Sequence, residues 1–215
     1  MGFTRRLLVV EDEPLMASLL ASALSNAGFE VDTANDVLQA RESIRNFDPD
    51  AVLLDISLGD GPSGLDLAHV LNKQRPDIAL IVLTKYPDPR TAGVETTLMP
   101  PNCGFLRKDR VKDTDYLLQS IEAALNDRTS EVRQDHDTSH PLAALSVKHL
   151  EVLRLMATGY TNEYIAKLKG ASQSTVERWN IEIFRTLDIN TKGNINPRVE
   201  AVRLFVTAAG VPDRL

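Results

Sequence analysis

The stretch "RRLLVVEDEP", residues 5–14, decides the fold of the first half of the chain. Its four apolar residues, 7–10, predict a short buried strand. A helical pattern begins at Pro14 and stops at Gly28, and proline is favourable in a first helical turn because its missing N–H has no intrahelical partner to lose. An acidic pair, Glu11 and Asp12, separates the two elements. The stretch therefore predicts a strand, an acidic turn and a helix, which is the beginning of an alternating α/β fold.

The same alternation continues as far as residue 126. Further strands are predicted at 30–34, 51–54, 79–83 and 104–107, and further helices at 36–47, 65–74 and 113–126. Strands that alternate with helices need crossover connections, and these produce a parallel sheet with helices on both faces. We therefore expect an α/β, doubly wound parallel sheet of five strands.

The second half of the chain has a different pattern. Residues 127–141 are polar and lack apolar periodicity, which predicts a solvated linker that contains His136 and His140. Neither histidine has a cysteine or further histidine nearby to complete a metal site. Helices are predicted at 147–157, 162–168, 175–187 and 197–209. We therefore predict an α/β domain over 1–126, a linker over 127–141 and a small all-α domain over 142–215.

Composition and charge exclude several classes of protein. No apolar run is long enough to span a bilayer, and the N-terminus lacks the features of a signal peptide, so we expect a cytoplasmic protein. The single cysteine, Cys103, excludes an internal disulfide and any multi-cysteine metal site. The net charge of −6 divides into −9 for residues 1–140 and +3 for residues 141–215. This asymmetry indicates that the two halves have different kinds of partner.

Polar side chains follow four of the predicted strands. Glu11 and Asp12 follow the first strand, Asp55 follows the third, Thr84 the fourth and Lys108 the fifth. The carboxyl ends of parallel strands meet at one edge of the sheet, which is where open sheets of this kind bind ligands. Three ionised carboxylates repel one another unless a hard cation such as Mg2+ lies among them. We therefore predict a Mg2+ site, with the hydroxyl and the ammonium placed to neutralise a phosphoryl group on Asp55.

The motifs "VVEDEP" (9–14), "LLDISL" (53–58) and "GFLRKD" (104–109), together with Thr84, resemble the receiver domain of two-component response regulators, which has a flavodoxin-like fold. The resemblance covers residues 5 to about 126. It implies that Asp55 accepts phosphate from a sensor histidine kinase. The residues that it implies for Mg2+ are Glu11, Asp12, Asp55 and the backbone carbonyl of Ser57. It also implies that Thr84 and Lys108 stabilise the phosphoryl group and that Phe105 is an aromatic switch residue, with a plain core residue as the less favoured alternative for Phe105.

The chain departs from the receiver pattern at two places. Gly59 occupies the usual proline position after Asp55, and the next glycine, Gly64, is nine residues after Asp55 instead of eight. Bulky residues, 85–87, follow Thr84 where the family prefers a small one. The region 88–104 is rich in proline and weakly helical, so a helix there is expected to be short or mobile.

Residues 145–209 are similar to the helix-turn-helix DNA-binding domain of NarL/LuxR-type regulators, through "LEVLRLMATGYTNEYIA" (150–166) and "STVERWNIEIFRTL" (174–187). By packing alone, these helices could instead form a docking bundle. The resemblance implies that the helix at 174–187 reads operator DNA and that the last helix forms a homodimer. The predicted DNA contacts are Thr161, Asn162, Ser174, Thr175, Glu177, Arg178, Ile181 and Arg185.

The predicted recognition helix carries unusual residues. Glu177 and Glu182 replace the family's lysine and asparagine, and Trp179 replaces a histidine. Glutamate repels phosphate but accepts a hydrogen bond from cytosine, so specificity could change without loss of binding. We expect Trp179 to pack against a neighbouring helix.

We expect a transcription regulator controlled by phosphorylation of Asp55, with no catalysis beyond gain and loss of its own phosphoryl group. One alternative is an atypical regulator that acts by heterodimerisation with a related regulator, which the two glutamates favour. Another is a regulator that binds DNA independently of phosphorylation, which Lys85 and the altered loop after Asp55 favour.

Overall fold

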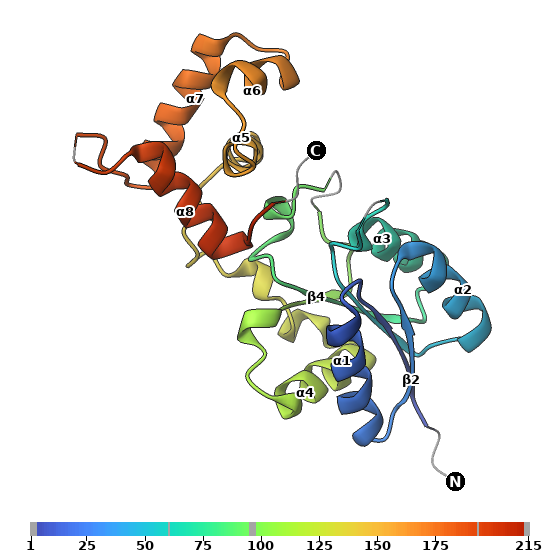
Figure 1. The fold of residues 1–215 in the computed structure, drawn as a ribbon. Helices are drawn as coiled ribbons and strands as arrows, with labels where there is room; N and C mark the ends of the chain where they lie inside the picture. The colour runs from blue at the N-terminus through green and yellow to red at the C-terminus, as the bar shows by residue number, and fades with distance from the viewer. Residues whose placement is uncertain (1–3, 60, 95–97, 193, 213–215) are drawn as a thin grey trace. The chain divides into compact units, whose positions relative to one another are not determined.

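The protein forms two compact units in a computed structural model that describes residues 4–59, 61–94, 98–192 and 194–212 (Figure 1). The α/β unit comprises Met1–Lys85 and Val94–His136. The helical unit comprises Tyr86–Gly93 and Asp137–Leu215. Among the described residues, none of the helices has the length and apolar character needed to cross a membrane.

The α/β unit is built on a five-stranded parallel sheet. Its strands are β1 (Arg6–Val10), β2 (Glu30–Ala34), β3 (Ala51–Leu54), β4 (Ala79–Thr84) and β5 (Cys103–Arg107). They are ordered β2-β1-β3-β4-β5, which is the flavodoxin-like order. The structure thus confirms the predicted fold of this unit.

Helices cover both faces of this sheet. They are α1 (Pro14–Asn26), α2 (Val37–Phe47), α3 (Gly64–Gln74) and α4 (Thr114–Leu125). Figure 1 shows α1 and α4 together on one face, with α2 and α3 on the other. Because both faces are covered, the central strands have no polar side: every residue of β3 is buried. The buried strands hold the residues after their carboxyl ends in fixed positions.

The segment 127–136, expected to be solvated linker, is folded against the α/β unit. It contains two short turns, η3 (Thr129–Glu131) and η4 (Gln134–His136). The Phe105 N–H donates to the Val132 carbonyl, and Arg107 N–H donates to Gln134 Oε1 at 2.7 Å. The expectation was wrong here because β5 is an edge strand, and its unpaired backbone groups gain partners from this polar segment.

The helical unit contains four helices near the predicted positions. They are α5 (Val147–Ala157), α6 (Asn162–Leu168), α7 (Gln173–Thr186) and α8 (Pro197–Ala209). Each helix begins after a side-chain cap, provided by Ser146, Thr161, Ser172 and Asn196. These caps satisfy backbone N–H groups that lack intrahelical partners, so a residue next to each helix in the sequence determines where that helix begins.

The segment 86–93, which follows β4, packs within the helical unit. In the described part of the region between β4 and β5, the only helical turn is η1 (Pro89–Thr91). Asp88 is buried there, its carboxylate 2.8 Å from Arg90 and 3.2 Å from His140. Arg90 also donates to the Leu145 carbonyl at 3.0 Å. His140 was expected to be a solvated linker residue, and this was wrong because its imidazole is buried beside a carboxylate.

Candidate functional site

Three carboxylates converge at the carboxyl edge of the sheet. Val10 and Leu54 are paired in register on β1 and β3, so the residues after them, Glu11 and Asp55, are neighbours. Glu11, Asp12 and Asp55 each have a carboxylate oxygen within 4.8 Å of the other two. Glu11 and Asp55 are buried, with 2% and 5% of their surfaces exposed. The sheet therefore concentrates negative charge at one position that is largely shielded from solvent.

Lys108 lies between two of these carboxylates. Its ammonium is 2.7 Å from Glu11 Oε2 and 2.8 Å from Asp55 Oδ2. Although burial alone would lower the pKa of Lys108, the charges of Asp55 and Glu11 hold it above its ordinary value. Burial raises the pKa values of Glu11 and Asp12, and the charge of Asp55 adds to this effect. One cation thus balances part of a three-carboxylate cluster.

The donor set fits Mg2+, because it consists of carboxylate oxygens and one of these oxygens is free. Glu11 Oε1 is buried and has no hydrogen-bond partner among the described residues. The backbone N–H groups of Ile56 and Ser57 approach Asp55 Oδ1 at 2.6 and 3.4 Å, which orients that carboxylate. Mg2+ prefers a few carboxylates completed by water. The predicted ligand role of the Ser57 carbonyl stays a prediction.

Thr84 is the last residue of β4, and Phe105 is the middle residue of β5. The Thr84 hydroxyl is fully buried and has no partner in the described structure. A buried hydroxyl without a partner costs free energy, so it is suited to an incoming oxygen ligand. Phe105 is also fully buried on β5, as either of its two predicted roles would require.

Gly64 approaches the site more closely than the sequence indicated. A Cβ on Gly64 would lie 1.8 Å from the backbone oxygen of Asp55. The Gly64 N–H donates to the Ile56 carbonyl at 2.9 Å, so α3 begins directly against the segment that follows β3. The altered loop therefore still brings a glycine to the position where no side chain fits.

Replacing Gly64 by alanine should displace this turn. We expect the free energy of unfolding of the α/β unit to fall by about 1–3 kcal/mol, the usual cost of overpacking. Urea denaturation followed by circular dichroism would measure the loss. Gly59→Ala is the control, since a Cβ at Gly59 meets no atom within 4 Å, although its positive φ adds local strain. Equal losses in the two variants would contradict the steric explanation.

Most of the predicted DNA-contacting side chains lie on one exposed stripe of α7. Ser174, Glu177, Arg178, Ile181 and Arg185 are exposed, and their spacing of three or four residues places them on one helix face. The opposite face is buried through Val176, Asn180 and Ile183. Thr175, also predicted, is half-buried at the edge of the stripe.

The structure separates the other predicted contacts from this stripe. The Thr161 hydroxyl caps α6 by accepting from Tyr164 N–H. Asn162 Oδ1 accepts from Asn180 at 3.0 Å and from Arg198 at 2.8 Å. These contacts join the starts of α6 and α8 to α7, so both side chains already have structural partners. Burial lowers the pKa of Arg198.

Two of the unusual residues of α7 contact side chains of α5. Glu182 lies 3.0 Å from His149 Nε2, and the half-buried Trp179 has the Lys148 ammonium 5.0 Å from its ring centre. The expected packing of Trp179 against a neighbouring helix is thus observed. Glu182, which sequence reasoning grouped with Glu177, belongs to the helix interface.

Comparisons with known proteins agree with this geometry. The model of the response regulator receiver domain matches residues 7–109, which include all the pocket residues. The chain is 28% identical to the oxygen regulatory protein NreC of Staphylococcus carnosus, over 75% of this chain and 80% of NreC. It is 27% identical to the nitrate/nitrite response regulator protein NarP of Escherichia coli, over 95% of this chain and 96% of NarP. Residues 7–109 therefore match a response regulator receiver domain, and the chain is similar to response regulators over most of its length.

Solved structures extend the similarity in fold to nearly the whole chain. RcsB of Salmonella enterica, bound to the promoter rprA with the phosphomimetic BeF3-, matches 95% of the chain with a TM-score of 0.59 and 20% identity. A second RcsB structure, in complex with DNA, matches 96% with a TM-score of 0.51 and 18% identity. Both units of the chain, each taken by itself, thus have a counterpart of related fold in RcsB.

Proposed function

We propose that the chain is a phosphorylation-controlled transcription regulator in which Asp55 accepts a phosphoryl group and α7 reads double-stranded DNA. The acidic pocket is the observation that carries this proposal. Lys108 contacts two of its carboxylates, and the buried Thr84 hydroxyl has no partner in the described structure. A nucleophile, a cation and a free hydroxyl donor together form a site for a phosphoryl group.

The proposed phosphotransfer needs these residues, a phosphodonor and Mg2+. A carboxylate oxygen of Asp55 attacks the phosphorus of a phosphohistidine on a sensor histidine kinase. A P–O bond forms, and the P–N bond breaks with its electrons going to the imidazole nitrogen. Lys108 and Thr84 hold the terminal oxygens through their ammonium and hydroxyl. Mg2+, held by Glu11, Asp12, Asp55 and the Ser57 carbonyl, would supply the remaining positive charge.

The DNA-reading role is supported by the exposed stripe of α7 and by the related fold of RcsB, which is described in complex with DNA and as dimers on DNA. A net charge of only +3 over residues 141–215 is weak for nonspecific binding. We therefore propose that a homodimer binds two half-sites. Val199 on α8 is 63% exposed, which agrees with a dimer contact through the last helix.

A second candidate is a regulator that acts through heterodimers. The acidic Glu177 favours it, because a carboxylate on the DNA-facing stripe opposes phosphate binding. Under this candidate α7 keeps its fold but does not bind operator DNA, and α8 pairs with a related regulator. Phosphate-independent DNA binding, the third possibility, predicts equal affinity with and without a phosphoryl mimic.

Fluorescence anisotropy on a pool of labelled genomic fragments separates these candidates. Titrations would be made at two salt concentrations, with and without beryllofluoride and Mg2+. We expect fragment-selective, salt-sensitive binding that tightens about 5- to 150-fold with the mimic, the usual range of allosteric coupling. The absence of selective binding in both states would overturn the DNA-reading role. Selective binding that ignores the mimic would overturn only the phosphate control.

A further inference from the structure

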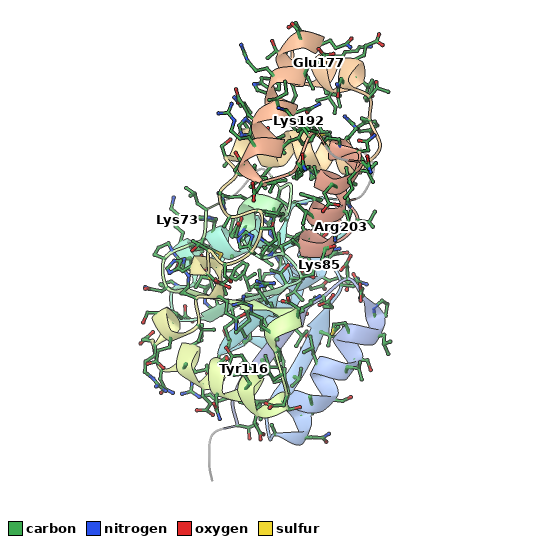
Figure 2. The ribbon with its side chains drawn as sticks, turned by 90° about the vertical axis from the view of Figure 1, so that its left-hand side faces the viewer. Lys73, Lys85, Tyr116, Glu177, Lys192 and Arg203 are labelled. Atoms are coloured by element: carbon green, nitrogen blue, oxygen red, sulfur yellow. The ribbon has the colours of Figure 1, made fainter. Side chains whose placement is uncertain are left out.

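Glu177 differs in its surroundings from the other acidic residue of α7. Its side chain is exposed, as Figure 2 shows, and Gln173 Nε2 donates to Glu177 Oε1 at 3.0 Å. No ion pair to Glu177 occurs in the part of the chain that the structure describes. Glu182 instead contacts His149. Glu177 therefore presents an un-neutralised acceptor on the stripe proposed to enter DNA.

The chemistry of base edges limits what such a carboxylate can contact. In the major groove, guanine presents only acceptors and thymine an acceptor and a methyl group, so both repel or ignore a carboxylate. Adenine presents a donor beside the N7 acceptor, whose lone pair opposes a second acceptor. Cytosine presents its N4 amino donor without a neighbouring major-groove acceptor of its own. Cytosine is thus the base that a carboxylate at this position would select.

We propose that Glu177 reads a cytosine in each operator half-site and that Gln173 is its positioning residue. The proposal rests on the proposed DNA-reading function of α7. The Gln173 amide holds Oε1 and leaves Oε2 to accept from cytosine N4. Phosphate repulsion makes the same carboxylate unfavourable wherever that donor is missing, so it lowers nonspecific binding while it favours the correct site.

Ile181 supplies a second contact on the same stripe. It lies one turn after Glu177, about 6 Å along the helix, and its side chain is 59% exposed. An apolar side chain on a DNA-facing surface suits the methyl group of thymine. We expect a thymine within about two base pairs of the selected cytosine, since base pairs rise about 3.4 Å each.

Selection from a randomised double-stranded DNA library would test the proposal with the full chain, beryllofluoride and Mg2+. The wild-type protein should enrich one cytosine per half-site. Glu177→Gln should move that preference to adenine, because a glutamine amide pairs with adenine N6 and N7. Competition titrations should show about a 5- to 100-fold loss of discrimination for cytosine, which corresponds to a good base contact. Gln173→Ala should weaken the preference without changing the base.

Glu122→Gln is the matched control, because Glu122 is an exposed glutamate on α4 and its change removes the same charge. It should leave the selected sequence unchanged. If the wild-type and Glu177→Gln proteins select the same sequence, the proposed cytosine contact of Glu177 is overturned, but the DNA-reading function of α7 is not. A wild-type protein that selects no sequence in either phosphorylation state would overturn the DNA-reading function as well.

Discussion

Replacing Asp55 by asparagine is expected to abolish phosphorylation, from nearly one phosphoryl group per chain to none. The amide lacks the negatively charged oxygen that would attack the phosphorus. Intact-mass measurement after incubation with acetyl phosphate and Mg2+ would count the added phosphoryl groups. The DNA-binding change caused by phosphorylation should disappear in the same variant.

Asp115→Asn is a suitable control for this experiment. Asp115 is an exposed carboxylate in the first turn of α4 and is not one of the three carboxylates of the pocket. It should leave phosphorylation at the wild-type level. Label that persists in the Asp55 variant would show that another side chain accepts the phosphate, and the proposed role of the pocket would then fail.

Replacing Asp88 by alanine should lower the free energy of unfolding of the helical unit by about 3–5 kcal/mol. The change leaves the buried imidazole of His140 and the guanidinium of Arg90 without their carboxylate, and removing one partner from a buried ion pair is costly. Trp179 is the single tryptophan and lies in this unit, so its fluorescence during urea denaturation reports the relevant transition.

Asp77→Ala provides the comparison for an exposed pair. Asp77 contacts Arg75 at 2.7 Å but keeps 61% of its side-chain surface exposed, so its loss should cost at most about 1 kcal/mol. Similar losses in the free energy of unfolding for Asp77→Ala and Asp88→Ala, each measured in its own unit, would contradict this prediction. They would show that the buried cluster stabilises its unit no more than the exposed pair does.

The contribution of Asp88 should depend on pH in a definite direction. Burial alone would raise its pKa, but His140 and Arg90 hold the pKa of this carboxyl below its ordinary value. A carboxyl with a lowered folded pKa stabilises the fold above its unfolded pKa of about 3.9 and loses this contribution as pH falls through the folded value. The stability difference between wild type and Asp88→Asn should therefore be full at pH 7 and shrink below about pH 4.

Local patterns were sufficient to predict most of the sheet and helices. Apolar runs such as 51–54 and caps such as Ser172 act within a few residues, so a single sequence contains them. The order of polar residues after the strands also predicted which side chains would share one edge. The contact of Lys108 with Glu11, 97 positions apart, follows from that topology without any further information.

The missed features depend on partners distant in sequence. Asp88 and His140 look like ordinary loop residues until folding brings them together, and no local pattern pairs them. Gly64 differs, because a glycine shortly after Asp55 was a visible signal of a close backbone approach. Glu177 and Glu182 could also have been separated, since five residues turn a helix by about 140° and place them on different faces.

The placement of residues 86–93 affects how the protein can be divided. The chain passes between the units three times, after residues 85, 93 and 136, instead of once at a linker. A fragment that starts at residue 137 would lack Asp88 and Arg90 and would leave His140 without its carboxylate. Such a fragment should be less stable than the same unit within the whole chain, and a protease cut near residue 137 would not yield two self-sufficient halves. Gene fusions or truncations that treat the C-terminal part as a portable module would thus discard part of its core.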